Sequence, residues 1–218
     1  MGKNTKPYKI SIVVPCWGRP ARTRRIINNI LAQKCDYHTW EAFVIGDGCP
    51  QFQNMIEGGE VEYFQKQASK RGNKFHMFNM DKNYGGCGYH IVNYAVEKAN
   101  SKYFIFAGND DIITPQHFTH YLSEIEETDL DLVYYQTFVC PENKIRDPKL
   151  VYGSIGHSEL IIKTDIVKKT THTSGYGHDF DFIQQVLKLS DKSKKADSQN
   201  QTYVVTHIPT IGSCDNID

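Results

Sequence analysis

The stretch SKYFIFAGNDD, residues 101–111, decides the fold: an apolar run ends in a glycine, an asparagine and two aspartates. The aromatic and β-branched residues of Tyr103 to Phe106 are typical of a buried strand. The same order of apolar run and polar turn occurs in ISIVVPCWGRP, residues 10–20, and in WEAFVIGDG, residues 40–48. Helical patterns separate these runs. The sequence therefore predicts an α/β fold with a mostly parallel central sheet flanked by helices.

Further elements follow from the same patterns on either side of this stretch. We expect strands at 10–14, 42–45, 75–78, 103–106, 132–139, 159–162 and 203–207, and helices at 20–33, 60–70 and 89–99 and from about residue 179. Thr114 followed by Pro115 predicts an N-cap and a first helical position, so that a helix begins just after Asp111. The almost wholly polar run 190–201 predicts a mobile loop.

Composition narrows the class of protein. A chain of 218 residues with 39% hydrophobic residues can bury one sizeable core, so we expect a single domain over residues 1–218. Basic and acidic residues balance at 25 each, which gives no electrostatic case for a general nucleic-acid or membrane binder. The six cysteines form no Cys-x-x-Cys pair, and no apolar run resembles a signal peptide or a membrane span. We expect a cytoplasmic protein without an integral membrane segment. The sequence does not indicate its oligomeric state.

The informative residues follow the predicted strands, because ligands of parallel sheets collect at the carboxyl ends of strands. Four such loops stand at residues 15–20, 46–48, 83–88 and 108–111. The first leads through Arg19 into a helix N-terminus that can face phosphate. In the last, Asp110 and Asp111 would repel each other unless a cation or water lay between them. Together the loops predict a nucleotide diphosphate bound through Mn²⁺ or Mg²⁺.

Each of these features also has a plainer interpretation. Asp47 between two glycines can simply form a turn, and the two aspartates after Gly108 can favour a helix N-terminus. Gly86 and Gly88 begin a dinucleotide-binding pattern, but Ile91 stands where its third glycine should be. Trp17 is more often a core or rim aromatic residue than a platform for a base.

As a set, the segments ISIVVPCWGRP, WEAFVIGDG, NYGGCGYHIVN, SKYFIFAGNDD and GYGHDFDF resemble the signatures of glycosyltransferase family 2, over roughly residues 8 to 187. The resemblance implies the GT-A fold, the Rossmann-like fold of nucleotide-diphospho-sugar transferases. The segments PCWGRP and IGDGCPQFQ further resemble those of bacteriophage-encoded members of the family.

The resemblance also implies roles for single residues. Pro15 and Trp17 would line the nucleobase pocket, and Asp47 would contact the base or ribose. The implied donor pocket comprises Asn83, Gly86 and Asn93. Asp110 would be the principal metal ligand.

In the predicted donor-binding half, the sequence departs from the family pattern at two acidic positions and one basic position. Gly46 and Gly108 stand where the family has the first acids of its two aspartate motifs, so Asn109 or Asp111 takes over part of the metal-binding role. Val92 replaces an arginine that contacts the donor. His207, at the end of the last predicted strand, is the best candidate for a third metal ligand.

Asp179 is the candidate catalytic residue. Gly177-His178-Asp179 resembles the family's Glu-Asp motif, with His178 in place of the glutamate. In inverting members that aspartate removes the proton of the acceptor hydroxyl, a task that suits a carboxylate. The plainer interpretation is that Asp179 caps a helix.

These inferences predict a metal-dependent, inverting glycosyltransferase that uses a nucleotide-diphosphate sugar, with residues 1–111 binding the donor and residues 112–218 serving the acceptor and the base. Asp47 favours uracil, since a carboxylate can accept the ring N–H. The acceptor is a saccharide, a protein or, for a viral protein in a host cytoplasm, a hydroxymethylated base of phage DNA. The alternatives are a catalytically inactive nucleotide-sugar-binding module and, less favoured, a nucleotidyltransferase.

Overall fold

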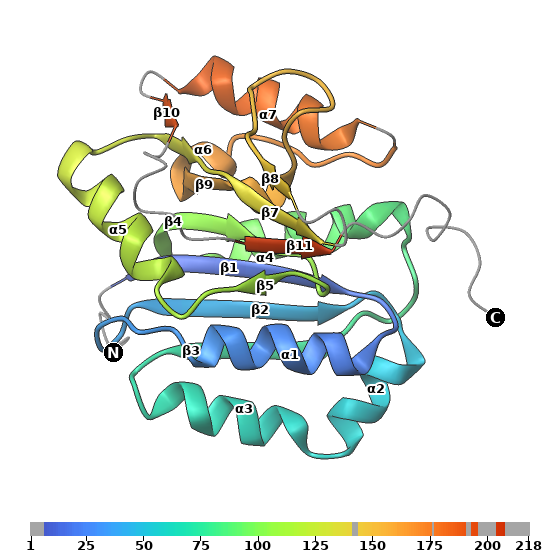
Figure 1. The fold of residues 1–218 in the computed structure, drawn as a ribbon. Helices are drawn as coiled ribbons and strands as arrows, with labels where there is room; N and C mark the ends of the chain where they lie inside the picture. Colours follow the sequence, from blue (N-terminus) through green and yellow to red (C-terminus); the bar gives the residue numbers. More distant parts are fainter. Residues whose placement is uncertain (1–6, 141–143, 176, 191–192, 196–203, 208–218) are drawn as a thin grey trace.

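A computed structural model describes residues 7–140, 144–175, 177–190, 193–195 and 204–207. Its larger sheet has seven strands in the order β10-β6-β9-β4-β1-β2-β3 (Figure 1). The strands are β1 (Tyr8–Cys16), β2 (Trp40–Gly46), β3 (Lys74–Asn79), β4 (Ser101–Phe106), β6 (Leu132–Tyr134), β9 (Leu160–Lys163) and β10 (Ser193–Lys195). Only β9 runs antiparallel to its two neighbours. The predicted mostly parallel sheet is confirmed.

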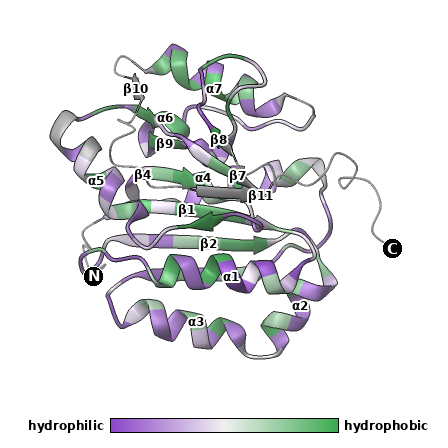
Figure 2. Cartoon of the chain, viewed as in Figure 1, coloured by the Kyte–Doolittle hydropathy of each residue, from purple (hydrophilic) through white to green (hydrophobic). Residues whose placement is uncertain are grey.

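Helices cover both faces of this sheet. They are α1 (Pro20–Leu31), α2 (Pro50–Glu57), α3 (Glu60–Ser69), α4 (Tyr89–Lys98), α5 (His117–Thr128), α6 (Thr164–Val167) and α7 (His178–Leu189), with short 3-10 turns η1 (Gly86–Gly88) and η2 (His157–Glu159). Hydrophobic residues gather along the strands, whereas hydrophobic and hydrophilic residues alternate along the helices (Figure 2). Within the described ranges, no helix is both long and apolar enough to cross a lipid bilayer.

Two hydrophobic clusters lie on opposite faces of the sheet, because successive residues of a strand point to opposite sides. Ile10, Ile12 and Val14 of β1 belong to the cluster that includes α1, α2, α3 and α5. Val13 belongs to the cluster that includes α4, α6 and α7. β1 is thus buried on both faces, as its continuous apolar run predicts.

A smaller sheet has the order β5-β11-β7-β8. It consists of β5 (Ile112–Ile113), β11 (Val204–His207), β7 (Thr137–Cys140) and β8 (Lys144–Arg146). The strand predicted at 132–139 is therefore two strands in two sheets. Tyr135 marks the change: its backbone N–H donates to the carbonyl of Glu159, and the chain then leaves the larger sheet.

The predicted start of the helix after Asp111 is wrong. Residues Ile112 and Ile113 instead pair with β11, and α5 begins only at His117. The Thr114 hydroxyl is buried and has no partner among the described residues, so it caps nothing. Strand pairing at a distance overrides the local capping signal here.

Two further elements differ from the sequence prediction. The helix α2 is absent from that prediction, although Pro50 at its first turn and buried Phe52 and Met55 are local helix signals. Within the run predicted to be a loop, Ser193–Lys195 forms β10, which pairs with β6 and is the edge strand of the larger sheet.

Candidate active site

The carboxyl ends of β1, β2 and β4 meet at one edge of the larger sheet. Cys16 pairs with Gly46, and Val13 pairs with Phe106, so the loops that follow these three strands are neighbours. The side-chain amide of Asn109 donates to the carbonyl of Trp17 over 3.4 Å. Trp17 itself is 46% exposed. The structure therefore brings the first, second and fourth predicted loops together.

Asp47 ties the glycine-rich loop to this edge. Its carboxylate is only 6% exposed and accepts the backbone N–H of Tyr84 on one oxygen and that of Gly85 on the other, each over 3.0 Å. Gly48 follows with φ of +66°, and a side chain there would meet the backbone of Lys82 at 2.2 Å. Asp47 thus has a structural task, and its predicted contact with a nucleobase stays a prediction.

The glycine-rich loop packs closely on its surroundings. A Cβ at Gly88 would come within 2.7 Å of Pro15, and one at Gly86 would meet the ring of Tyr89 at 2.6 Å. The side chain of Asn83 accepts the N–H of Gly85 over 2.6 Å. Only glycine allows this approach at positive φ. The backbone of the loop is consequently exposed to the space above the strand ends.

Asn93 of α4 joins this region to the second half of the chain. Its side chain donates to the carbonyl of His172 over 2.9 Å and accepts the N–H of the same residue over 3.0 Å. The contact fixes the segment that leads to α7. Whether Asn93 also shapes the donor pocket stays a prediction.

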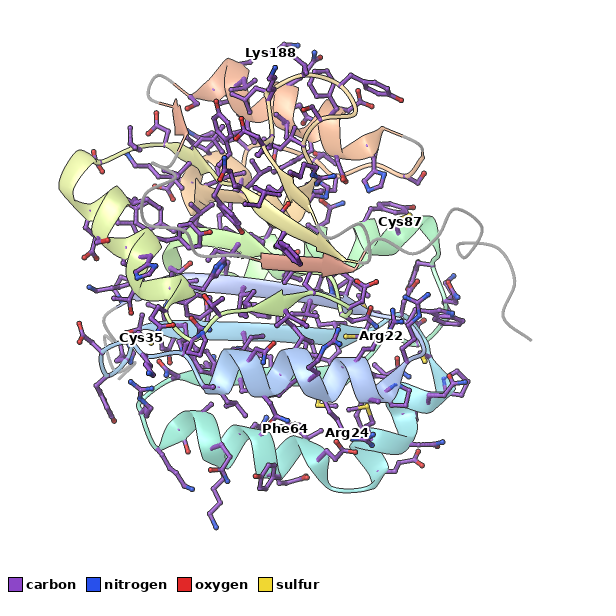
Figure 3. The ribbon with its side chains drawn as sticks, in the orientation of Figure 1. Arg22, Arg24, Cys35, Phe64, Cys87 and Lys188 are labelled. Carbon is purple, nitrogen blue, oxygen red and sulfur yellow. The ribbon has the colours of Figure 1, made fainter. Side chains whose placement is uncertain are left out.

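Asp110 is held by arginines of α1 and the loop before it. Its Oδ2 lies 3.3 Å from Arg19 and 3.7 Å from Arg22, and its carbonyl accepts a hydrogen bond from Arg25 over 2.7 Å. These arginines are three residues apart, so they lie on one side of the helix. The side chain of Arg24 instead points toward α3 and forms an ion pair with Glu60 (Figure 3).

Asp111 has a different environment from Asp110. It is 2% exposed, and its Oδ2 accepts the N–H of Gly108 over 2.6 Å and the hydroxyl of Ser158 over 2.7 Å. Burial raises the pKa of the Asp111 carboxyl to about 7, although these two hydrogen bonds oppose the rise. Its contacts hold the loop to η2. A ligand role for Asp111 stays a prediction.

A divalent cation fits this edge through Asp110. The carboxylate is 17% exposed, and Mg²⁺ or Mn²⁺ commonly takes one or two carboxylates together with substrate phosphates and water. A cation would replace the charge that Arg19 and Arg22 now supply to Asp110, which would leave both guanidinium groups available to phosphate oxygens. His207 ends β11, but its side chain lies outside the described part of the chain.

The two family departures have structural reasons. A Cβ at Gly46 would lie 2.3 Å from the Asn79 side chain and 2.6 Å from that of Phe52. Asn79 occupies this space and bonds both the N–H and the carbonyl of Cys49. A Cβ at Gly108 would lie 2.8 Å from Asp110 Oδ1. An acid at either position would require its neighbours to move.

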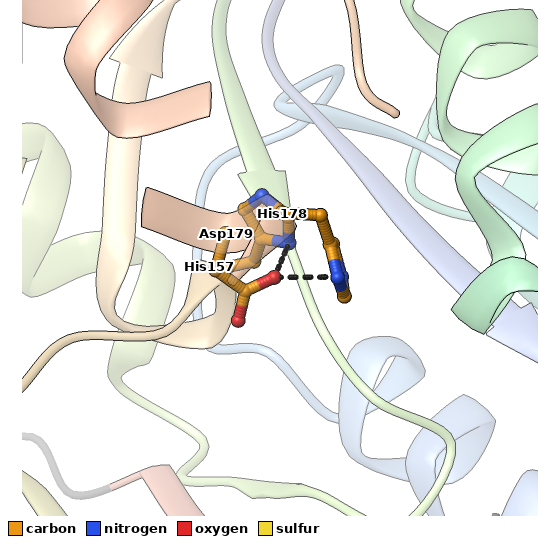
Figure 4. A group of neighbouring side chains, drawn as sticks. All are labelled: His157, His178 and Asp179. Atoms are coloured by element: carbon orange, nitrogen blue, oxygen red, sulfur yellow. Dashed lines mark ion pairs between the residues drawn. The ribbon is translucent and has the colours of Figure 1, made fainter. Parts of the chain in front are cut away.

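Asp179 lies in the first turn of α7 and contacts two imidazoles (Figure 4). Its Oδ1 lies 2.7 Å from His157 Nδ1 and 2.9 Å from His178 Nε2. Burial alone would raise the pKa of this carboxyl, but the hydrogen bonds from both histidines hold the pKa well below its usual range. The hydrogen bond to Asp179 in turn raises the pKa of His178. The carboxylate is 35% exposed and thus accessible.

The element η2 connects Asp179 to the strand ends. It carries His157, which contacts Asp179, and Ser158, which contacts Asp111. The His157 ring also stacks at 5.1 Å on Phe106, the last residue of β4. η2 therefore links the base candidate to Asp111 and to the end of β4.

Glu159, the last residue of η2, belongs to a buried ion pair that holds this turn in place. Glu159 is fully buried, and its carboxylate binds the guanidinium of Arg146 through two contacts of 2.7 and 2.6 Å. It also accepts the Thr137 hydroxyl and the N–H of Gly156, each over 2.7 Å. The sequence prediction of the site did not include Glu159 and Arg146. No periodicity or motif in 144–159 distinguishes them.

Comparison with known proteins identifies the family. The sequence model described as glycosyl transferase family 2 matches residues 11–185, which is most of the chain. The chain belongs to glycosyltransferase family 2. An uncharacterized glycosyltransferase of Rickettsia bellii is 30% identical over 114 residues, 52% of this chain and 14% of that protein.

Solved structures show the fold of the family. S. aureus TarS 1–349 in complex with UDP-GlcNAc has a TM-score of 0.78 at 13% identity, covering 96% of this chain and 61% of TarS 1–349. The mannosyltransferase PcManGT of Pyrobaculum calidifontis, in complex with GDP-Man and Mn²⁺, has a TM-score of 0.69 at 12% identity, covering 96% and 59%. The chain thus spans under two thirds of each of these relatives.

The family match confirms the predicted resemblance to glycosyltransferase family 2, and the solved structures confirm the predicted GT-A fold. Membership of this family weighs against the nucleotidyltransferase alternative. The resemblance to bacteriophage-encoded members gains no support, since none of the proteins named above comes from a bacteriophage.

Proposed function

We propose that this glycosyltransferase transfers a sugar, with inversion, from a uridine-diphosphate sugar to an acceptor hydroxyl. The observation that carries the proposal is the accessible carboxylate of Asp179, joined through η2 to the end of β4 and to Asp111, the neighbour of Asp110. A carboxylate there can take the proton of an acceptor hydroxyl as the sugar carbon is attacked from the opposite side to the diphosphate.

In this proposal residues 1–218 form one domain, and the two halves of the chain have different roles. Residues 1–111 hold the donor and residues 112–218 hold the acceptor and the base. Trp17 offers an exposed ring for the base to stack on, and the backbone of the glycine loop approaches the donor sugar. Contacts of η2 and Asn93 with the two halves support the division, because they keep Asp179 close to the donor side.

Uracil is the proposed base, and Asp47 is its proposed partner. A carboxylate has about four lone-pair positions, and the N–H groups of Tyr84 and Gly85 occupy two of them. One remaining position can accept the ring N–H of uracil. TarS binds UDP and UDP-GlcNAc, whereas PcManGT binds GDP-Man, so the fold itself accommodates either base.

Asp110 is the proposed ligand of a Mn²⁺ or Mg²⁺ ion. When bound, the ion would neutralise charge on the leaving diphosphate. Arg19 and Arg22, at the start of α1, would then bind phosphate oxygens. PcManGT was solved with Mn²⁺, which supports a cation in this fold.

For the acceptor we propose a saccharide or a protein hydroxyl. A DNA acceptor needs basic side chains free to meet phosphates. The proposal assigns Arg19 and Arg22 to the donor diphosphate, Arg25 contacts the carbonyl of Asp110, and Arg24 pairs with Glu60, so these arginines do not form such a patch. This observation weighs against a modified base of DNA.

The test compares Asp179→Asn with a matched control, Asp181→Asn, in the same first turn of α7 but exposed. UDP binding is measured by calorimetry with and without Mn²⁺, and transfer or hydrolysis of UDP-sugars by mass spectrometry. We expect Asp179→Asn to lower turnover about 10² to 10⁴-fold with donor affinity nearly unchanged. Asp181→Asn should behave as wild type.

The alternative is a sugar-nucleotide-binding module without catalysis, suggested by glycine at positions 46 and 108. It predicts UDP binding with neither transfer nor hydrolysis by the wild type. Equal turnover of Asp179→Asn and wild type would eliminate Asp179 as the base.

A further inference from the structure

Two histidines and an aspartate present their ligand atoms to one point. His157 Nδ1, His178 Nε2 and Asp179 Oδ1 all lie within 4.8 Å of one another (Figure 4). The three side chains are 16%, 18% and 35% exposed, so a small ion and a water molecule can reach them from solvent. Within the described part of the chain, no other group of three such ligand atoms converges in this way.

The second nitrogen of His178 has the partner that a metal-bound imidazole requires. Nδ1 of His178 lies 2.5 Å from the carbonyl oxygen of Gly175. Histidines that bind metal commonly donate their other N–H to a carbonyl or carboxylate, which fixes the ring and its tautomer. With Nδ1–H on the Gly175 carbonyl, Nε2 faces Asp179. An ion that displaced the Nε2 proton would find the lone pair of Nε2 directed at the cluster. The ring is therefore oriented before any ion arrives.

The ligand types distinguish this cluster from the site at Asp110. Two imidazoles and one carboxylate suit Zn²⁺, whereas Mg²⁺ prefers oxygen ligands alone. Bonds of about 2.0–2.1 Å in a tetrahedron place ligand atoms about 3.3 Å apart. The present separations of 2.7 and 2.9 Å would open by a few tenths of an ångström, which side-chain rotation can supply.

The surrounding charge also permits a cation. The guanidinium of Arg146 lies near the cluster, since a Cβ on Gly156 would lie 3.4 Å from Arg146 Nη2 and 3.5 Å from Asp179 Oδ2. Glu159 pairs with this guanidinium through two contacts and balances its charge. The carboxylate of Asp179 would thus remain to balance part of the charge on the ion.

We propose that His157, His178 and Asp179 form a Zn²⁺ site separate from the cation site at Asp110. Water would complete the tetrahedron. The ion would bind the carboxylate that the acceptor hydroxyl needs, so zinc would inhibit sugar transfer. The binding site stands on its geometry alone, and the inhibition rests on the proposed function.

The first experiment measures binding of ZnCl₂ to the metal-free chain by competition with a chromophoric chelator. We expect one tight site, weakened about tenfold or more in His157→Gln and in His178→Gln. The matched control is His120→Gln, on α5 and outside the cluster; Cys87→Ser tests the exposed thiol. Both controls should bind zinc as the wild type does. Circular dichroism verifies that each variant folds.

A second readout is Co²⁺ absorption. A tetrahedral site of nitrogen and oxygen ligands should give visible bands without thiolate charge transfer, and the bands should disappear in His178→Gln. Zinc affinity unchanged in both cluster variants, or charge transfer from thiolate, would overturn the site.

The third experiment measures sugar transfer with Mn²⁺ in excess. Zinc at one equivalent per chain should inhibit the wild type, and a chelator followed by fresh Mn²⁺ should restore activity. Equal inhibition by zinc in wild type and His178→Gln would refute the inhibitory role. If the wild type transfers no sugar while zinc binding depends on His157 and His178, the proposed function fails and the site stands.

Discussion

Replacing Arg146 by methionine tests the buried ion pair under η2. Glu159 is fully buried, and its carboxylate accepts three hydrogen bonds, one of them from Arg146 Nε, and forms an ion pair with Arg146 Nη2. Arg146→Met leaves the Thr137 hydroxyl and the Gly156 N–H on a carboxylate that has lost its counter-ion. Removing one partner of a buried pair costs about 3–5 kcal/mol. The guanidinium is 31% exposed, so water can reach part of the vacated space, and we expect about 3 kcal/mol.

The assay is urea unfolding at 25 °C, followed by the fluorescence of buried Trp40 and by circular dichroism. The double variant Arg146→Met with Glu159→Gln removes both charges, and it should recover much of the lost free energy of unfolding. Lys98→Met, which breaks an exposed pair with Glu97, is the control and should leave the unfolding midpoint unchanged. A loss below about 1 kcal/mol for Arg146→Met, or no recovery in the double variant, would refute the reasoning.

Other predictions follow from individual contacts. The raised pKa of Asp111, about 7, means that the folded chain holds this proton more tightly than the unfolded chain. The free energy of unfolding should therefore fall between about pH 4 and pH 7, and Asp111→Asn should remove about 2–4 kcal/mol of that fall in urea titrations. Asp110→Ala should abolish the strengthening of UDP binding by Mn²⁺; calorimetry that still shows it would exclude the ligand role. Gly46→Asp should lower stability by about 1–3 kcal/mol, because the new side chain meets Asn79 and Phe52; an unchanged melting temperature would contradict this. UDP should bind more tightly than GDP in the same calorimeter, and the reverse order would overturn the choice of uracil.

The first half of the fold could be predicted because its signals are local. The continuous β-branched run of β1 and the apolar face of α1 lie within single segments. The start of α5 could not, because Ile112 and Ile113 pair with β11, about ninety residues away in sequence. The same holds for β10, whose partner is β6.

The same contrast between local and long-range signals applies to the candidate site. Asp47, Asp110 and Asp179 could be selected from the sequence, since each follows a strand or begins a helix. Their partners could not be selected, because contacts such as that of His157 with Asp179 join residues far apart in the chain. Asp110 and Asp111 are adjacent in sequence, yet one faces arginines and the other is buried. Only the fold separates their chemistry.

The contacts between α1 and the segment after β4 have a mechanical consequence. Arg25 bonds the carbonyl of Asp110, and the buried side chain of Gln33, just beyond α1, bonds the carbonyl of Thr114 and the N–H of Phe118. The middle of α1 and the residue just beyond its C-terminal turn are thus attached to the stretch that runs from Asp110 into α5. The helix and that stretch should therefore move as one rigid body.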